Sequence, residues 1–327
     1  MKKLTIFLFI IALALVQIGC NTGSKVEFIE KENQIDVMFE GKLITSYLHG
    51  SDLLKPCLYP VKAPSGAVLT RAYPFEEIEG ETSDHPHHTG LYFTYASKGE
   101  VNGDSFWNLH DVPPQIKHIK VLDIEQEKNE GKITTLSHWI NRNNQPILEE
   151  KREMEIVVLE NEYRVDFTIE LTAIDTTVTF QDTKEGMFAI RVADWLTENT
   201  KGTLYKSTGE YLNAEGEKTE KNVWGKQSSW VRLEGEKDGK RIGIAIYHHP
   251  ESINFPTYWH ARGYGCFAAN PIGQYDFQKG RKEENPQYRT LIIEKGETAL
   301  FKFRMTIYEG EKKKEQFDQE FKDFSKN

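Results

Sequence analysis

The stretch REMEIVVLENEYRVDFTIELTAI (residues 152–174) alternates apolar and polar side chains on both sides of a short polar interruption. Strict alternation places the apolar side chains on one face of an extended chain, which is typical of a half-buried β-strand. Glu160-Asn161-Glu162 carries no such pattern and predicts the turn between two strands. The stretch therefore predicts an antiparallel hairpin, whose buried face is formed by Met154, Ile156, Val158, Tyr163, Val165, Phe167, Ile169 and Leu171.

The same alternation recurs along the chain. Residues 230–250 predict a second hairpin with Asp238-Gly239 at its turn, and residues 26–48 and 289–310 predict further hairpins. Helical spacing occurs only near the end, where Phe317, Phe321 and Phe324 would dock a short helix on the sheets. The sequence contains neither an internal repeat nor a Pro-rich linker that would mark a boundary between domains. The fold class is therefore all-β, a large antiparallel β-sandwich with a short C-terminal helix, in one domain over residues 26–327.

The chain begins MKKLTIFLFIIALALVQIGC, a charged start followed by an apolar run that ends at Gly19-Cys20. This pattern predicts a signal peptide over residues 1–19, lipidation of Cys20, and a tether over residues 20–25. We expect a lipid-anchored protein in the envelope of a Gram-negative bacterium, held by outer-membrane lipid and facing the periplasm. Ordinary cleavage, with Cys20 discarded or free, is the alternative. No later stretch has the ~20 apolar residues that a membrane helix requires.

Charge and cysteine content narrow the classes of function. Loss of Lys2 and Lys3 reduces the 41 basic side chains to 39 against 50 acidic ones, so the formal net charge changes from -9 to -11. An acidic protein lacks the basic surface that nucleic-acid binding requires, so no nucleic-acid partner is expected. Cys57 and Cys266 fit either one disulfide or two buried thiols.

The segment DHPHH (residues 84–88) holds three of the ten histidines. In an extended backbone His85 and His87 project to one side and His88 to the other. Two imidazoles on one face would form an acid/base pair or chelate a divalent metal ion. The alternative is that these rings pack and form hydrogen bonds at the entry to a strand.

Two further segments carry candidate site residues. In residues 100–111 Asn102-Gly103 predicts a turn, Trp107 is either a sugar platform or a core residue, and His110 would join the histidines. In residues 182–196 Glu185 precedes Gly186 at a strand start and is the candidate general base. Arg191 lies within the strand and needs either a carboxylate partner or an anionic ligand.

Residues 247–273 concentrate His, Trp, Tyr, Asn and Gly. Such a composition is typical of a binding loop, although an irregular crossover with sharp turns also explains the glycines. The candidate binding residues in this segment are His249, Trp259, His260 and Asn270.

Several motifs together resemble a known family. SDHPHHTGLYF, VNGDSFW, DTKEGMFAIRVA, VWGKQSSWV and HHPESINFPTYWHARGYGCFAANPIG occur in the order found in the bacterial family labelled PmoA, or "methane oxygenase". The resemblance spans Leu53 to Tyr308. It implies a secreted or lipid-anchored protein whose gene lies near sugar-handling genes. Methane chemistry is not expected, because a particulate methane monooxygenase subunit spans the membrane several times and this chain does not.

The resemblance also implies a fold similar to the galactose-mutarotase-like supersandwich, in which His and Glu side chains act on sugar rings. Thr89 departs from the family pattern, and so do Cys57 and Cys266. The departure at Cys57 and Cys266 argues against a disulfide between them. The matching polar positions are His85, His87, His88, Asn102, Glu185, Arg191, His249, His260 and Asn270.

The sequence thus favours a carbohydrate-active periplasmic enzyme, an epimerase, lyase or glycosidase. His85, His87 or His260 would donate a proton and Glu185 would withdraw one. The substrate-binding residues would be His88, Asn102, Trp107, Arg191, His249, Trp259 and Asn270. The alternatives are a sugar-binding lipoprotein without chemistry, and a metalloenzyme in which His85 and His87 ligate a divalent metal as cofactor.

Overall fold

The computed structural model describes residues 25–107, 112–199 and 202–326. The predicted signal peptide, the lipidation site Cys20 and His110 lie outside the described residues. In the described part no helix has the length and apolar character needed to cross a membrane.

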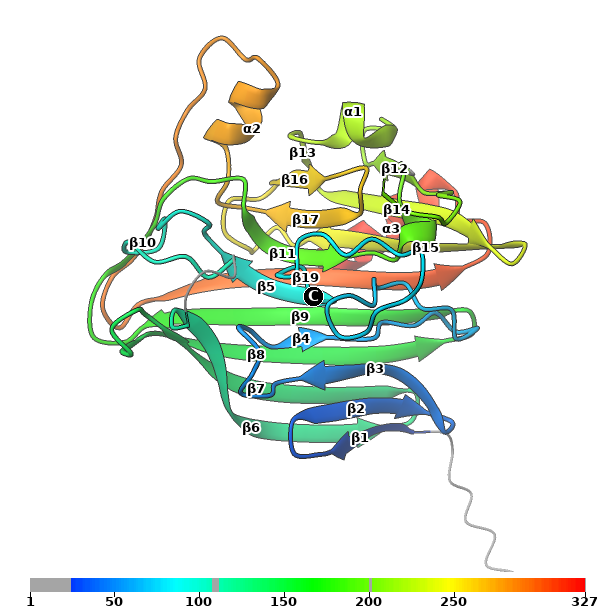
Figure 1. Cartoon of the computed structure of the whole chain (residues 1–327), viewed down its shortest axis with the longest axis horizontal. Coiled ribbons are helices and arrows are strands. Elements are labelled where there is room, and N and C mark those ends of the chain that lie inside the picture. Colours follow the sequence, from blue (N-terminus) through cyan, green and yellow to red (C-terminus); the bar gives the residue numbers. More distant parts are fainter. Residues whose placement is uncertain (1–24, 108–111, 200–201, 327) are drawn as a thin grey trace, which may run out of the picture.

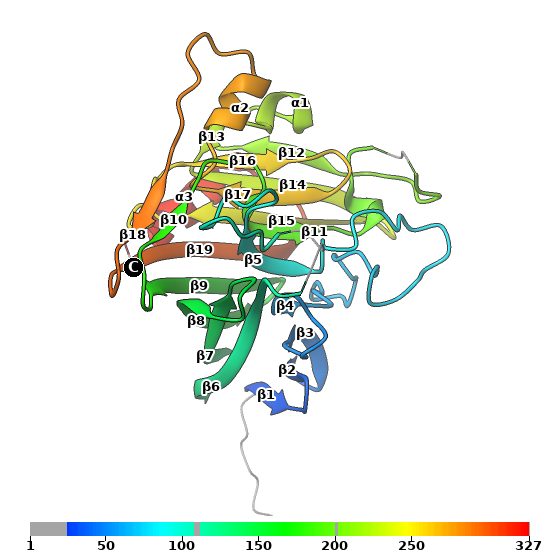
Figure 2. The same ribbon diagram turned by 60° about the vertical axis from the view of Figure 1, so that its left-hand side comes forward.

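Two large antiparallel sheets form the body, as predicted, and they lie against each other in Figures 1 and 2. One sheet has the strand order β1 (Val26–Glu30), β2 (Gln34–Phe39), β3 (Lys42–Leu48), β4 (Cys57–Leu58), β5 (Leu91–Tyr95), β11 (Gly186–Arg191), β17 (Cys266–Asn270), β16 (Thr257–Ala261) and β13 (Gln227–Ser228). The other has the order β12 (Glu210–Asn213), β14 (Trp230–Lys237), β15 (Lys240–His248), β19 (Thr298–Glu309), β9 (Glu162–Ala173), β8 (Pro146–Leu159), β7 (Glu130–Ile140) and β6 (Gln115–Glu127).

The predicted hairpins are present with one exception. β8 pairs with β9 across the turn at Glu160-Asn161, and β14 pairs with β15 across Asp238-Gly239. The expected hairpin over residues 289–310 is wrong, because β18 (Leu291–Ile293) pairs with β10 (Val178–Phe180) in a separate two-stranded sheet. Local alternation identified β18 and β19 (Thr298–Glu309) but contained no information about a partner for β18 more than a hundred residues away.

The central strands β5, β11, β17 and β16 of the nine-stranded sheet are buried on both faces, and this decides where the site lies. Phe93 and Phe188 face the eight-stranded sheet and belong to the main core. The next side chains along the same strands, Tyr92 and Ala189, point to the opposite face and pack in a second, smaller cluster with Trp107. Because neighbours along a strand alternate between faces, this second face carries a separate set of side chains.

Short helices complete the fold. α3 (Lys314–Phe324) is the predicted C-terminal helix, and its buried Phe317 and Phe324 pack against Trp230 and Tyr308 of the eight-stranded sheet. α1 (Thr219–Val223) and α2 (Tyr275–Gly280) lie at the end of the molecule where β13 and β16 run (Figures 1 and 2). A 3-10 helix covers Asp194–Leu196.

Cys57 and Cys266 are both buried and both free, so they are thiols and not a disulfide. They belong to the smaller cluster on the second face of the nine-stranded sheet. Burial raises the pKa of each thiol to about 12, which leaves both protonated and unreactive near neutral pH.

Candidate active site

The three histidines of residues 84–88 lie in a turn, and the expected extended backbone is wrong. His88 N donates to the carbonyl oxygen of His85 at 3.0 Å, and His85 has a φ of 46°. The rings of His85 and His88 therefore stack at 4.9 Å instead of pointing to opposite sides. His87 meets both rings edge-on, at 5.7 Å from His85 and 4.5 Å from His88. Pro86 is the second residue of this turn, a position that its fixed φ favours.

Asp84 is the electrostatic centre of the turn. Its Oδ1 accepts from Arg71 Nη1 at 2.5 Å and from Arg191 Nη2 at 2.7 Å, and its Oδ2 lies 2.9 Å from His85 Nδ1. Both arginine side chains are almost fully buried, whereas the carboxylate of Asp84 is 46 % exposed. Burial acts to raise the pKa of Asp84, but the bond with His85 and the charges of Arg191 and Arg71 hold it far below its usual value. Asp84 is therefore ionised near neutral pH.

Tyr264 closes one side of this group. It lies in the turn between β16 and β17, where Gly265 N donates to the carbonyl oxygen of Arg262. Its ring stacks on His85 at 5.4 Å, and the guanidinium groups of Arg191 and Arg262 lie 4.8 Å and 5.3 Å from its centroid. The aromatic ring thus holds His85 in place and shields two cations.

Glu185 and His260 form the second acid-base group. Glu185 pairs with Lys184, and the buried His260 places Nδ1 3.1 Å from the carbonyl oxygen of Lys184. Burial acts to raise the pKa of Glu185, but His260, the Lys184 ammonium and His87 together outweigh it, and the pKa is lowered. Glu185 is thus an ionised carboxylate in a largely enclosed position, which suits a general base.

His87 connects the two groups. Burial, followed by the charges of Lys55 and His85, lowers its pKa to about 4, while Glu185 opposes this shift. Burial likewise lowers the pKa of His260 to about 4, again against the charge of Glu185. The carboxylate of Glu185 is therefore within electrostatic reach of both imidazoles, and both imidazoles are neutral near pH 7.

A cavity of about 590 Å³ opens beside this arrangement. It is large enough for a sugar-sized ligand. Asp84, Tyr264 and Arg262 form part of its wall, and Glu220 pairs with Arg262 at 2.7 Å. The remaining lining residues are Thr82, Ser83, Asn199 and Gly202.

The structure thus brings His85, His87, His88, Glu185, Arg191 and His260 together. Trp107 packs beside His88, whereas the other predicted binding residues of the described chain have other partners. His249 accepts from Glu251 N through Nδ1, and its Nε2 lies 3.0 Å from the carbonyl oxygen of Phe324, so it anchors α3. Trp259 is fully buried in the main core, because its position on β16 faces the eight-stranded sheet.

Three more predicted binding residues have structural partners. Trp107 is buried with its ring edge-on to His88 and Tyr92, so it supports these side chains from within the smaller cluster. Asn102 lies in its turn with a φ of 49° and binds the backbone of residues 177 and 179. Asn270 accepts from the backbone N–H groups of residues 272 and 273.

No group of three or more His, Cys, Asp and Glu side chains in residues 25–107, 112–199 and 202–326 is arranged to hold a metal ion. His85 and His87 are close, but Nδ1 of His85 is already engaged by Asp84.

Sequence reasoning missed four residues of the site. Asp84, Arg71 and Tyr264 organise the histidine turn, and Lys55 is buried with its Nζ donating to the carbonyl oxygen of His87 at 2.8 Å. Burial lowers the pKa of Lys55 to about 8. Asp84 and Tyr264 lay within the stretches singled out above, whereas Arg71 and Lys55 carried no local signal, since a lone basic residue in a loop is usually solvated.

Residues 34–322 match the family model described as "Family of unknown function (DUF6807)". The chain belongs to this family. The match does not support the PmoA label, because the description of the family names no activity. A search of curated proteins found none that matches the chain.

Solved structures of similar shape are carbohydrate-active proteins of low identity. A putative aldose 1-epimerase from Escherichia coli K12 is 10 % identical with a TM-score of 0.31, covering 88 % of this chain and 99 % of its own. A 4-alpha-glucanotransferase from Thermococcus litoralis is 8 % identical with a TM-score of 0.29, covering 90 % and 38 %. The GH36 alpha-galactosidase AgaA from Geobacillus stearothermophilus, in complex with stachyose, is 10 % identical with a TM-score of 0.28, covering 87 % and 40 %. The chain thus spans about two fifths of the last two proteins.

Proposed function

We propose that this protein is a carbohydrate-active enzyme that uses His85 and Glu185 as an acid-base pair on a sugar. One observation carries the proposal: the Asp84–His85 pair and the Glu185 carboxylate both act electrostatically on His87, and Asp84 lines a sugar-sized cavity. Two proton-transfer groups with different environments are what epimerisation, elimination and glycoside cleavage all require.

Asp84 gives His85 its role. The carboxylate accepts from Nδ1–H, which leaves Nε2 as the proton-transfer atom of a side chain that is 43 % exposed. Asp84 stabilises the imidazolium form of His85, whose Nε2–H donates a proton to an oxygen of the sugar while Glu185 withdraws one. The two buried arginines hold Asp84, so the imidazole is oriented before a substrate arrives.

Glu185 is the partner that withdraws a proton from a hydroxyl or from an acidic C–H group of the sugar. The Lys184 ammonium favours its ionised form, and its enclosure limits competition from water. His87 and His260, neutral near pH 7, provide hydrogen bonds to sugar hydroxyls on either side of the carboxylate. The apolar run that ends at Gly19-Cys20 supports a lipid-anchored, periplasm-facing location in the cell envelope for this activity.

Proton NMR in D₂O tests the proposal, because it detects a chemical change at any position of the sugar. The protein is incubated with a panel of aldoses, uronic acids and glycosides, and the anomeric and ring signals report mutarotation, epimerisation, elimination or hydrolysis. We expect at least one sugar to change, and Glu185→Gln to slow that change by about 100-fold or more with the fold retained. Glu251→Gln, at an exposed carboxylate paired with Lys302, is the matched control and should keep full activity.

Two outcomes contradict the proposal. If Glu185→Gln converts the sugar at the wild-type rate, Glu185 is not the base. If no sugar changes while calorimetry shows binding, the protein is the sugar-binding lipoprotein without chemistry. Loss of activity on chelation, with stoichiometric metal by elemental analysis, supports instead the metalloenzyme alternative.

A further inference from the structure

Buried hydrogen-bonding atoms without a partner gather at the candidate active site. Within the part of the chain that the structure describes, Nε and Nη1 of Arg191, the hydroxyl of Tyr92 and Nδ1 of His88 have none. All three side chains are at most 2 % exposed. Leaving such groups unpaired costs roughly 1–3 kcal/mol each, so a site that retains several of them is built for a partner that arrives later.

These atoms belong to one place on the second face of the nine-stranded sheet. Tyr92 on β5 pairs with Ala189 on β11, and Arg191 is two residues further along β11, so the two side chains are diagonal neighbours on the same face. The His88 ring stacks on Tyr92 at 6.3 Å. The charge of Arg191 contributes to the pKa shifts of both Tyr92 and His88, which confirms that the three groups share one environment.

The same place holds a positive charge without a counterion. Lys55 is 2 % exposed, and its Nζ lies 4.6 Å from the centroid of the Tyr92 ring. Among residues 25–107, 112–199 and 202–326 it forms no ion pair with a carboxylate, unlike Lys184 and Arg262, which are paired with Glu185 and Glu220. Burying an ammonium group without a carboxylate is costly, and a ligand with one negative charge would offset that cost.

We infer that the sugar bound at this site carries a carboxylate group, as a uronic acid does. The inference rests on the proposed function and adds the substrate class to it. The unpaired N–H groups of Arg191 and the Tyr92 hydroxyl are donors, and the carboxylate oxygens are the acceptors they lack. Lys55 supplies a matching positive charge beside the Tyr92 ring.

Tyr264 controls access to these donors. Its ring covers the Arg191 guanidinium at 4.8 Å, yet it is only partly buried and stands in a four-residue turn that contains Gly263 and Gly265. It also lines the 590 Å³ cavity, so a rotation of this side chain joins the cavity to Nε and Nη1 of Arg191. The carboxylate end of a sugar would then enter from the cavity, with its ring on the side of His85.

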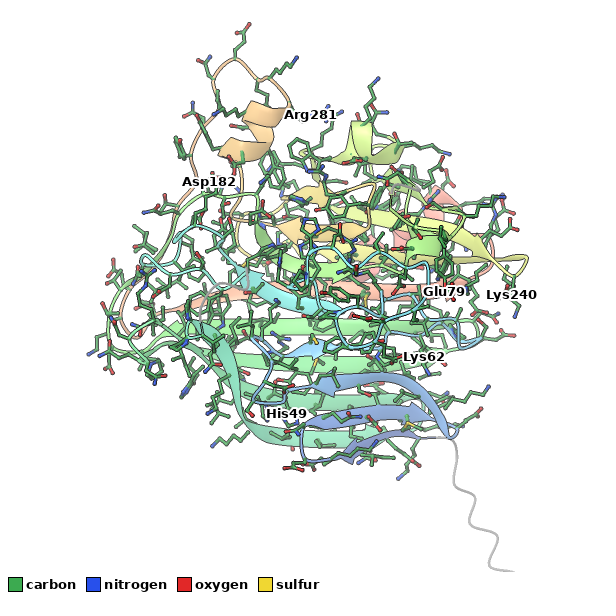
Figure 3. The ribbon with its side chains drawn as sticks, viewed as in Figure 1. His49, Lys62, Glu79, Asp182, Lys240 and Arg281 are labelled. Carbon is green, nitrogen blue, oxygen red and sulfur yellow. The ribbon has the colours of Figure 1, made fainter. Side chains whose placement is uncertain are left out.

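Isothermal titration calorimetry with glucuronate and galacturonate, each compared with its methyl ester and its parent aldose, tests the inference. We expect the wild-type protein to bind one uronate at least about tenfold more tightly than its neutral counterparts. Lys55→Met should remove this preference, whereas Lys62→Met, at a partly buried lysine of another cavity (Figure 3), should keep it. The ester comparison needs no variant, so it stands even if Lys55→Met does not fold.

Equal or tighter binding of glucose or galactose overturns the inference and leaves the proposed acid-base function intact. Tighter binding of glucose 6-phosphate than of glucuronate, or no binding of either uronate at millimolar concentration, overturns it as well. Uronate binding without turnover supports the inference and contradicts the proposed function, so the two failures are distinguishable.

Discussion

Nδ1 of His85 lies 2.9 Å from Oδ2 of Asp84, while Oδ1 of the same carboxylate bridges two buried arginines. The aspartate therefore has two tasks. It is the counterion that the buried Arg71 and Arg191 share, and it fixes the orientation of an imidazole that is partly open to solvent. A group fixed on both sides in this way can direct proton transfer without reorganisation.

Asp84→Asn tests this arrangement. The amide keeps the shape of the side chain but cannot neutralise two arginines or stabilise an imidazolium at His85. We expect the turnover of any sugar found by NMR to fall by about 100-fold or more. The free energy of unfolding should fall by about 2 kcal/mol, because two buried arginines lose a counterion that is itself partly screened by solvent. Rates at fixed substrate and urea denaturation measure the two effects.

Asp175→Asn is the matched control for Asp84→Asn, because Asp175 is 83 % exposed and lies 3.5 Å from Lys295. Both the rate and the stability should stay at wild-type values in this variant. An Asp84→Asn protein with normal turnover would show that Asp84 is only a structural counterion for the arginines.

The sequence was sufficient for the strands and for much of the site. Alternation with period two located β8, β9, β14, β15 and β19, because each of these strands buries one face against the same core. It failed at β18, which follows the same pattern but pairs with β10. Pairing depends on the path of the whole chain, and a local pattern does not record it.

The amino-acid composition of short segments predicted the location of the candidate site better than it predicted the roles of individual residues. His85, His87, Glu185, Arg191 and His260 come from distant segments and do meet, as their residue types suggested. Other residues of the same segments have structural positions, such as Trp259 in the core and Asn102 in a turn. A sequence shows that a segment is rich in functional groups, but the strand register decides which face each one occupies.

Acid should weaken the fold through its buried histidines. Burial lowers the pKa of His248 to about 3 and that of His260 to about 4, against ~6.5 in an unfolded chain. Between these values the unfolded chain binds protons that the folded protein does not, so stability is fully present above about pH 6.5 and is lost as the pH falls toward 4. Each histidine contributes on the order of 3 kcal/mol to this loss.

Urea denaturation at a series of pH values between about 7.5 and 4.5 measures this slope. His248→Gln should flatten it, because the amide retains a hydrogen bond to Ser252, which lies 2.8 Å from His248 Nε2, without titrating. A pH-independent free energy of unfolding for the wild-type protein would show that these histidines are solvated.

Gly186 positions Glu185 through close packing and not through flexibility. It is opposite Tyr95 in the β5–β11 pair, and a Cβ at this position would collide with the Tyr95 ring. That ring cannot easily move, because its hydroxyl donates to the carbonyl oxygen of Gln181 at 2.9 Å and accepts from Thr183 N at 3.0 Å. Ala96 N donates to the carbonyl oxygen of Glu185 at 3.0 Å, so any displacement of β11 from β5 moves the proposed base.

Gly186→Ala is therefore expected to cost about 3 kcal/mol of stability and to reduce turnover, since overpacking displaces β11. The double variant Gly186→Ala/Tyr95→Ala separates this collision from a general effect of alanine. With the ring removed, the added methyl group has space, and its cost should fall below about 1 kcal/mol relative to Tyr95→Ala alone. An equal cost in both backgrounds would show that Gly186 is needed for its backbone conformation and not for the approach of Tyr95.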